Sequence, residues 1–111
     1  MGIQNLSEDV VLVTLPAEPQ TVDELKAANE ILSNKGDCDV VVDFSGVDTI
    51  TSSSISNLII LHELLRKRRC QLIFCNVAVL TKCIFTVAGL DAVFDFVDDK
   101  PAALAAVKHA D

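Results

Sequence analysis

Several residue types that mark common classes of protein are absent or scarce in this chain. It has no Trp or Tyr, only 4 Gly and 3 Pro in 111 residues, and 9 basic residues against 16 acidic ones. The resulting net charge of −7 opposes binding to phosphate backbones and to anionic lipid surfaces. The few glycines form none of the glycine-rich loops that cradle nucleotide phosphates. We therefore expect no nucleic-acid partner and no nucleotide-using enzyme.

Long apolar runs are also missing. None approaches the roughly 18 to 20 residues that a membrane span needs, and the first residues lack the basic-then-apolar layout of a secretory signal. We expect a cytoplasmic protein with no direct membrane insertion. The 4 cysteines include no C-x-x-C pair, and each lies in or beside an apolar segment. We expect buried thiols of a reducing compartment and no metal site.

The residues that are present are sufficient for one folded domain, predicted over residues 1–111. Hydrophobic residues make up 50% of the chain. Apolar, β-branched runs predict strands over 9–15, 39–44, 70–75 and 93–97, with 2–6 as a possible short partner. Helical spacing of apolar residues predicts helices over 21–36, 52–69, 78–88 and from residue 99 onward, the first opened by a capping box at 21–24. This alternation predicts an α/β fold: a mixed, mostly parallel sheet of about four to five strands with about four helices.

The most informative stretch is the hydroxyl-rich run from Thr51 to Ser56, where the strand over 39–44 gives way to a long helix. In parallel sheets, sites form beyond the carboxyl ends of the strands, which is the place this run occupies. Hydroxyl groups at a helix start can cap the helix, accept a phosphate or act as a nucleophile. Capping is the simplest interpretation, with Ser52 as the N-cap.

A nucleophilic serine would need a base beside it. His62 lies ten residues further along the same predicted helix, about 15 Å away, and His109 is near the end of the chain. A G-x-S-x-G turn is also missing. We therefore predict that the protein is not an enzyme and uses no cofactor. The basic run Arg66–Arg69 fits a solvated helix C-terminus better than a nucleic-acid patch.

One set of segments resembles a known family. V-V-V-D-F-S-G-V at 40–47, followed by a short turn, hydroxyl residues and a long apolar helix, resembles the STAS domain of bacterial anti-sigma-factor antagonists. The segments 70–77, 87–91 with Phe94, and 100–104 are similar to later parts of that domain. The resemblance thus covers nearly the whole chain.

This resemblance implies a regulatory binding protein. In the family, the antagonist binds an anti-sigma factor that is also a serine-protein kinase, and phosphorylation of one serine in a D-S-S-G-L-G-like motif releases it. Matched by position, Thr51 stands for the aspartate and Ser52 for the phosphorylated serine, Ser53 for the second serine, Ser54 and Ser56 for the glycines, and Ile55 for the leucine. The acceptor is retained, but its acidic neighbour and both glycines are not.

The implied site follows from this match. Ser52 is the implied phosphorylation site, with Ser53 and Thr51 as secondary candidates. The implied partner-binding residues are Asp48, Thr51, Ser52, Ser53, Ser54, Ile55 and Ser56. The alternative is a STAS scaffold or accessory subunit of a stress-signalling or lipid-transport assembly, which docks a partner without being phosphorylated. A homodimer is compatible with either interpretation.

Overall fold

The computed structural model describes residues 2–108, so His109 lies outside the described residues. Within this range the chain forms five strands and four helices. In chain order these are β1 (Gly2–Asn5), β2 (Val10–Thr14), α1 (Gln20–Ser33), β3 (Asp39–Asp43), α2 (Ser52–Lys67), β4 (Leu72–Cys75), α3 (Val79–Val87), β5 (Asp95–Val97) and α4 (Lys100–Lys108). The predicted α/β fold is confirmed. None of the described helices has both the length and the apolar character needed to cross a bilayer.

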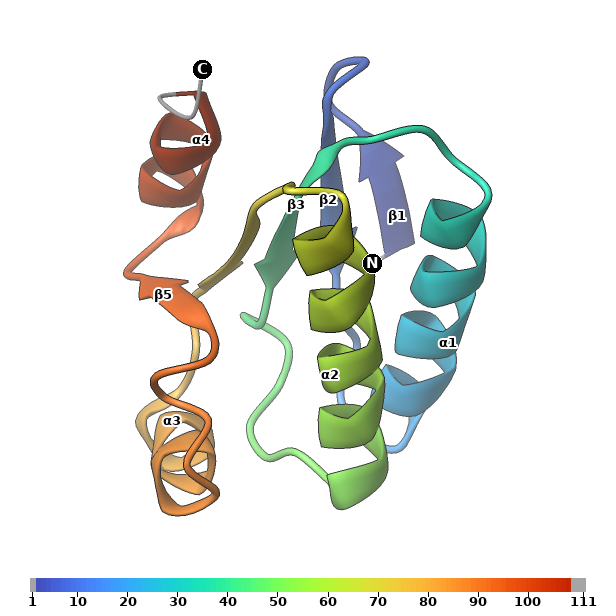
Figure 1. Cartoon of the computed structure of the whole chain (residues 1–111). Helices are drawn as coiled ribbons and strands as arrows, with labels where there is room; N and C mark the ends of the chain where they lie inside the picture. Colours follow the sequence, from blue (N-terminus) through green and yellow to red (C-terminus); the bar gives the residue numbers. More distant parts are fainter. Residues whose placement is uncertain (1, 109–111) are drawn as a thin grey trace.

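The sheet is mixed and mostly parallel, as predicted. Its strands follow in the order β1-β2-β3-β4-β5, with β1 antiparallel to β2 and every other pair parallel. Each crossover steps in the same direction across the sheet, so right-handed connections place α1, α2 and α3 on one face. Figure 1 shows α1 and α2 side by side. The last helix, α4, packs against β3, β4 and β5.

The core consists of two clusters, one on each face of the sheet. Successive residues of a strand point to opposite faces. Val40 and Val42 accordingly join the larger cluster with Phe85 of α3, whereas Val41 joins the smaller cluster with Ala103 of α4. The larger cluster contains an aromatic group in which Phe74 lies 4.9 Å from Phe44 and 4.7 Å from Phe94, between ring centroids. β3 is therefore the buried central strand that its apolar sequence predicted.

The start of α1 differs from the prediction. Pro19 is the N-cap, and Thr21 lies inside the helix, fully buried. Its hydroxyl donates a hydrogen bond to the Pro16 carbonyl at 2.7 Å. The predicted capping box at 21–24 is wrong because the threonine side chain turns back to the preceding loop.

The orientation of α3 also differs from what its apolar spacing predicts, which is that the apolar side packs on the sheet. Residues Leu80, Cys83, Ile84 and Val87 share one helical side, but Leu80 is 72% exposed and Val87 89% exposed. The side that faces the sheet carries Thr81 and Phe85. Phe85 fills the aromatic core, and the Thr81 hydroxyl donates to the Asp48 carbonyl at 3.2 Å. These two contacts turn Leu80, Cys83 and Val87 toward solvent, while Ile84 stays half-buried against the larger core cluster.

The cysteine prediction holds only in part. All four are free thiols, with Cys38 and Cys75 buried and Cys70 half-buried, but Cys83 is exposed because it belongs to the outward side of α3. Burial, followed by the nearby Asp43 charge, raises the pKa of Cys75 to about 11. The thiol of Cys75 therefore stays protonated.

Candidate functional site

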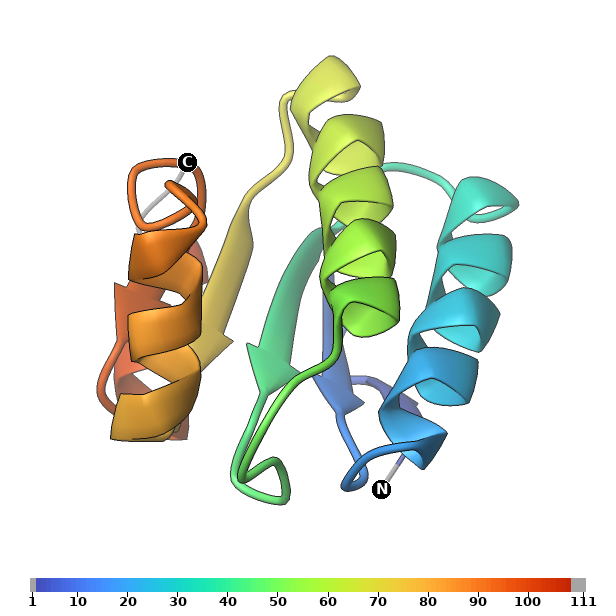
Figure 2. The ribbon, with the colours of Figure 1, turned by 90° about the horizontal axis from the view of Figure 1, so that it is seen from below.

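The hydroxyl run lies at the carboxyl edge of the sheet, where two loops pack together. One loop joins β3 to α2 and the other joins β2 to α1, and Figure 2 shows both at its lower edge. Gly46 permits the close approach, since a Cβ there would lie 2.9 Å from the Leu15 carbonyl oxygen. The start of α2 is thereby held beside the residues that precede α1.

Thr51, rather than Ser52, caps α2. Thr51 has an extended backbone, with φ −94° and ψ 163°, and its side-chain oxygen accepts a hydrogen bond from the Ser54 N–H at 3.2 Å. Ser52 is the first helical residue and is exposed. The predicted N-cap is therefore wrong by one residue, because the extended residue before the helix is the one whose side chain can reach the first turn.

Glu18 is a residue of this site that the sequence interpretation missed. Its Oε2 accepts hydrogen bonds from the Thr51 N–H at 2.9 Å, the Thr51 hydroxyl at 3.2 Å and the Ser54 hydroxyl at 2.6 Å. The signal in the sequence was an acidic residue between Pro16 and Pro19, just beyond a strand. Its partners, however, lie more than thirty residues away in the chain, at separations of 33 and 36.

The predicted site residues are brought together, but not all of them face solvent. Ser52, Ser53 and Ser56 are exposed, whereas Ser54 is fully buried. Ile55 is half-buried and packs against the larger core cluster. Asp48 and Thr51 are exposed, although the Asp48 carbonyl is bound by Thr81 and the Thr51 hydroxyl by Glu18.

Apolar side chains continue the exposed surface beyond the serines. Ile59 and Ile60 of α2 are 39% and 55% exposed. On α3, the outward apolar side borders a hollow of about 600 Å³ lined by Thr49, Leu80, Cys83, Ile84, Val87 and Ala88. Thr49 belongs to the loop that leads into α2. The hydroxyl run is therefore followed along α2 by exposed apolar side chains and preceded by Thr49, which lines the hollow at α3.

A buried carboxylate lies at the same edge of the sheet, at the end of β3. Asp43 accepts hydrogen bonds from the Ser45 N–H and from Asn76 Nδ2, both at 3.0 Å, and Lys100 Nζ lies 3.7 Å from its other oxygen. Burial by itself would raise the pKa of Asp43, but the bonds from Asn76 and Ser45, with the Lys100 charge, together lower that pKa below its ordinary value. Asp43 is therefore a charged structural link between β3, β4 and α4.

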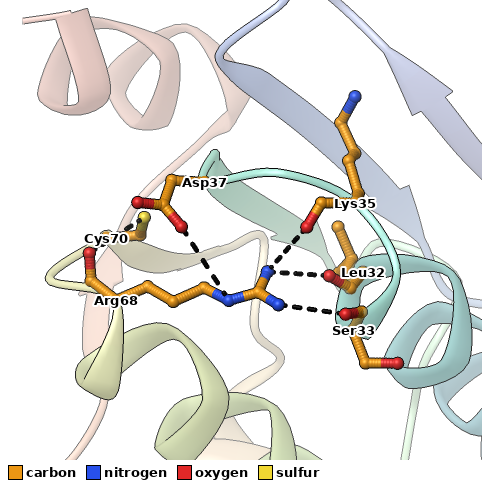
Figure 3. A network of polar contacts seen from close by, with 6 residues as sticks. All are labelled: Leu32, Ser33, Lys35, Asp37, Arg68 and Cys70. Carbon is orange, nitrogen blue, oxygen red and sulfur yellow. Dashed lines mark hydrogen bonds and ion pairs between the residues drawn. The ribbon is translucent and has the colours of Figure 1, made fainter.

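The basic run at the end of α2 is not simply solvated. Arg68 Nη1 donates to the carbonyls of Leu32 at 2.8 Å and Lys35 at 3.0 Å, and Nη2 donates to the Ser33 carbonyl at 3.0 Å. Figure 3 shows the guanidinium pointing into the end of α1. Free carbonyls at a helix C-terminus attract cations, so Arg68 caps α1 from another helix. The expectation of a solvated end is wrong for this residue.

His62, which was expected to be out of reach of the serines, packs against an aromatic side chain of the core. His62 is half-buried, with its ring edge-on to Phe94 at 5.6 Å between centroids. In the described part of the chain, no three His, Cys, Asp or Glu residues form a group that could hold a metal ion. The site itself consists of exposed serine hydroxyls next to the Glu18 carboxylate that binds Thr51 and Ser54.

Comparisons with known proteins agree on one family. The model of the STAS domain matches residues 9–103. An anti-sigma-factor antagonist STAS domain protein from Planctomyces limnophilus is similar in structure, with a TM-score of 0.82, 18% identity, and coverage of 97% of this chain and 99% of that one. No curated protein sequence matches the chain significantly.

Two further structures are similar over nearly their whole length. For the Bacillus cell-fate determinant SpoIIAA in its phosphorylated form, the TM-score is 0.70 at 14% identity, covering 94% of this chain and 96% of that one. For a chain of the stressosome, a hub of signal integration and transduction, it is 0.77 at 18% identity, covering 96% and 95%. At these identities the likeness establishes the fold.

Proposed function

Because this chain belongs to the STAS domain family, we propose that it is a regulatory binding protein and not an enzyme, namely an anti-sigma-factor antagonist. Its partner in this proposal is an anti-sigma factor that is also a serine-protein kinase, which places both proteins in the cytoplasm. The observation that carries the proposal is the exposed hydroxyl group cluster at the start of α2, bordered by the exposed side chains of Ile59 and Ile60. A polar centre beside apolar side chains suits a protein interface.

Within this proposal, Ser52 is the phosphorylated residue and Ser53 a secondary acceptor. Ser52 is exposed and is the first residue of α2, where a phosphate finds free N–H donors and the positive end of the helix dipole. Thr51 is a weaker acceptor because its hydroxyl already bonds Glu18. A phosphate adds roughly −1.5 to −2 charge, so in a buried interface it weakens binding by repulsion and desolvation.

The first prediction concerns a charge at position 52. Ser52→Asp should keep the fold and lose binding to the proposed anti-sigma kinase, because the carboxylate enters the interface. The matched control is Ser7→Asp, an exposed serine in the turn between β1 and β2 at the opposite edge of the sheet. Calorimetric titration of both variants measures the difference, and mass spectrometry after incubation with the kinase and ATP locates the phosphate.

Equal binding by the natural chain and by Ser52→Asp would contradict the phosphorylation switch. A second function is favoured by a specific observation: Thr51 and Ser54 are already bound to Glu18, and a stressosome chain has the same fold. It is a docking module of a larger signalling assembly that is not phosphorylated. Partner binding without phosphate incorporation would select this function.

A further inference from the structure

Glu18 belongs to the loop between β2 and α1, yet its carboxylate lies at the first turn of α2. One oxygen, Oε2, accepts all three hydrogen bonds from Thr51 and Ser54. The other oxygen, Oε1, is buried and has no hydrogen-bond partner among the described residues. A buried carboxylate oxygen without a partner costs free energy. Glu18 is therefore held at the start of α2 with one carboxylate oxygen fully bonded and the other buried without a hydrogen-bond partner among the described residues.

The bonds form a capping box whose two halves come from different segments. In an ordinary box, the N-cap side chain accepts from the third helical N–H, and a Glu or Gln at that third position reaches back to the N-cap N–H. Thr51 and Ser54 supply the first half, at 3.2 Å. Ser54 is too short for the second half, which Glu18 Oε2 supplies at 2.9 Å from the Thr51 nitrogen. An anion thus already occupies the positive end of α2.

We propose that Glu18 is the residue through which the domain responds to phosphorylation at Ser52: the phosphate displaces the Glu18 carboxylate from the start of α2 and releases the loop between β2 and α1. The inference rests on the proposed function, because it takes Ser52 as the acceptor. In the modification, a bond forms between Ser52 Oγ and the γ-phosphorus of ATP while the bond from that phosphorus to the leaving ADP oxygen breaks. The hydroxyl proton goes to the kinase or to solvent.

The physical reason is competition between two anions for one helix start. Ser52 is the next residue after Thr51, whose N–H and hydroxyl both hold the carboxylate. A phosphate brings roughly −1.5 to −2 charge and three strong acceptor oxygens to this position, and a neighbouring Glu then experiences like-charge repulsion. Glu18 is the group expected to move, because the hydrogen bonds that hold its carboxylate come from a different segment and its other oxygen has no hydrogen-bond partner among the described residues.

The test uses the isolated protein with phosphoserine incorporated at position 52 during translation. The ratio of the unfolding equilibrium constants with and without phosphoserine should be on the order of tenfold larger in the natural chain than in Glu18→Gln, whose amide oxygen accepts the same bonds without charge. The contacts of the phosphate with the helix start are common to both, so the difference reports the repulsion of Glu18. Exchange of the Val22 N–H, which donates to the Pro19 carbonyl at 3.3 Å, reports release of the loop. That exchange should speed up only when Glu18 is present.

Phosphoserine at position 56 is the matched control, since Ser56 is exposed on the same helix one turn further on. Its effect should be the same with Glu18 and with Gln at position 18. Equal effects of phosphoserine 52 in the two backgrounds would overturn the proposal. If the phosphorylated natural chain does not fold, folding of the phosphorylated Glu18→Gln variant supports it and failure of both overturns it. No partner is present in these measurements, so loss of the proposed function would appear separately, in the binding experiment.

Discussion

Asp43 links three segments at this edge of the sheet through a buried, charged side chain. Its side chain is 5% exposed and receives bonds from a backbone N–H of the following loop and from the Asn76 amide, with Lys100 of α4 nearby. Each donor comes from a different segment. Because the net effect is a lowered pKa, folding favours the ionised form of Asp43.

This leads to a prediction about pH. A lowered folded-state pKa means that the contribution of Asp43 is fully present above its unfolded-state pKa of about 3.9, and is lost as pH falls through the folded-state pKa. Asp43→Asn should lower the free energy of unfolding by about 1 to 3 kcal/mol at neutral pH. It should also flatten the decline of that free energy at acid pH. Urea unfolding at a series of pH values checks both effects, and an unchanged acid profile in the variant would exclude this role.

At the scale of elements, α2 is joined to its neighbours at both ends. Glu18 binds its first turn, and Arg68, just after its last residue, caps the end of α1. These contacts come in addition to the apolar packing of α1 against α2. Polar contacts at both ends of α2 therefore help to set its position relative to α1 and to the loop before α1.

The prediction for Arg68 follows from its geometry. A planar guanidinium reaches the carbonyls of Leu32, Ser33 and Lys35 at once, whereas a lysine ammonium is a single point charge on a flexible stem. Arg68→Lys should lower the free energy of unfolding by about 1 to 3 kcal/mol and speed amide exchange at the end of α1. Arg66→Lys, at an exposed pair with Glu63, is the control and should change neither. An unchanged free energy of unfolding in Arg68→Lys would show that the positive charge is sufficient and that the planar guanidinium is not needed.

At the scale of the whole molecule, the two faces of the sheet are covered unequally. α1, α2 and α3 cover one face, while the other relies on α4, whose Ala103 and Val107 pack on Leu12, Val41 and Ile73. The second layer is thin but it completes the burial of the central strand. Loss of its packing should therefore destabilise the domain as a whole.

A pair of substitutions on opposite sides of α4 tests the second layer. Ala103 is fully buried and Ala105 is exposed on the same helix. Ala103→Asp should lower the free energy of unfolding by about 3 kcal/mol or more, because it buries an unpaired carboxylate. Ala105→Asp should change it by about 0.5 kcal/mol or less. Thermal unfolding with matched midpoints for the two variants would mean that α4 is not an integral layer.

Part of the site could be predicted because its information is local. The hydroxyl run, the strand before it and the helix after it lie within one short segment, so the position of Ser52 at a helix start was correct. Its assignment as the N-cap was wrong because the choice between Thr51 and Ser52 depends on the φ and ψ angles at the helix boundary. Glu18 could not be connected to the site because the contact joins two loops that are distant in sequence.

The orientation of helices illustrates the same division. Apolar spacing correctly predicted a helix over α3, but most of its apolar stripe faces outward, since Phe85 and Thr81 face the sheet. A hydrophobic pattern gives the period of an element. It does not say which side meets the rest of the molecule when both sides carry apolar residues.

The sequence by itself determined the alternation of strands and helices, the mostly parallel sheet and the place of the hydroxyl cluster, because these follow from short-range patterns of apolar and turn residues. Only the tertiary structure decided which hydroxyls are free, which loop supplies the carboxylate and what Arg68 caps. Those outcomes depend on contacts across 33 to 36 residues of chain, formed when the crossovers bring separate loops and helix ends to the same place.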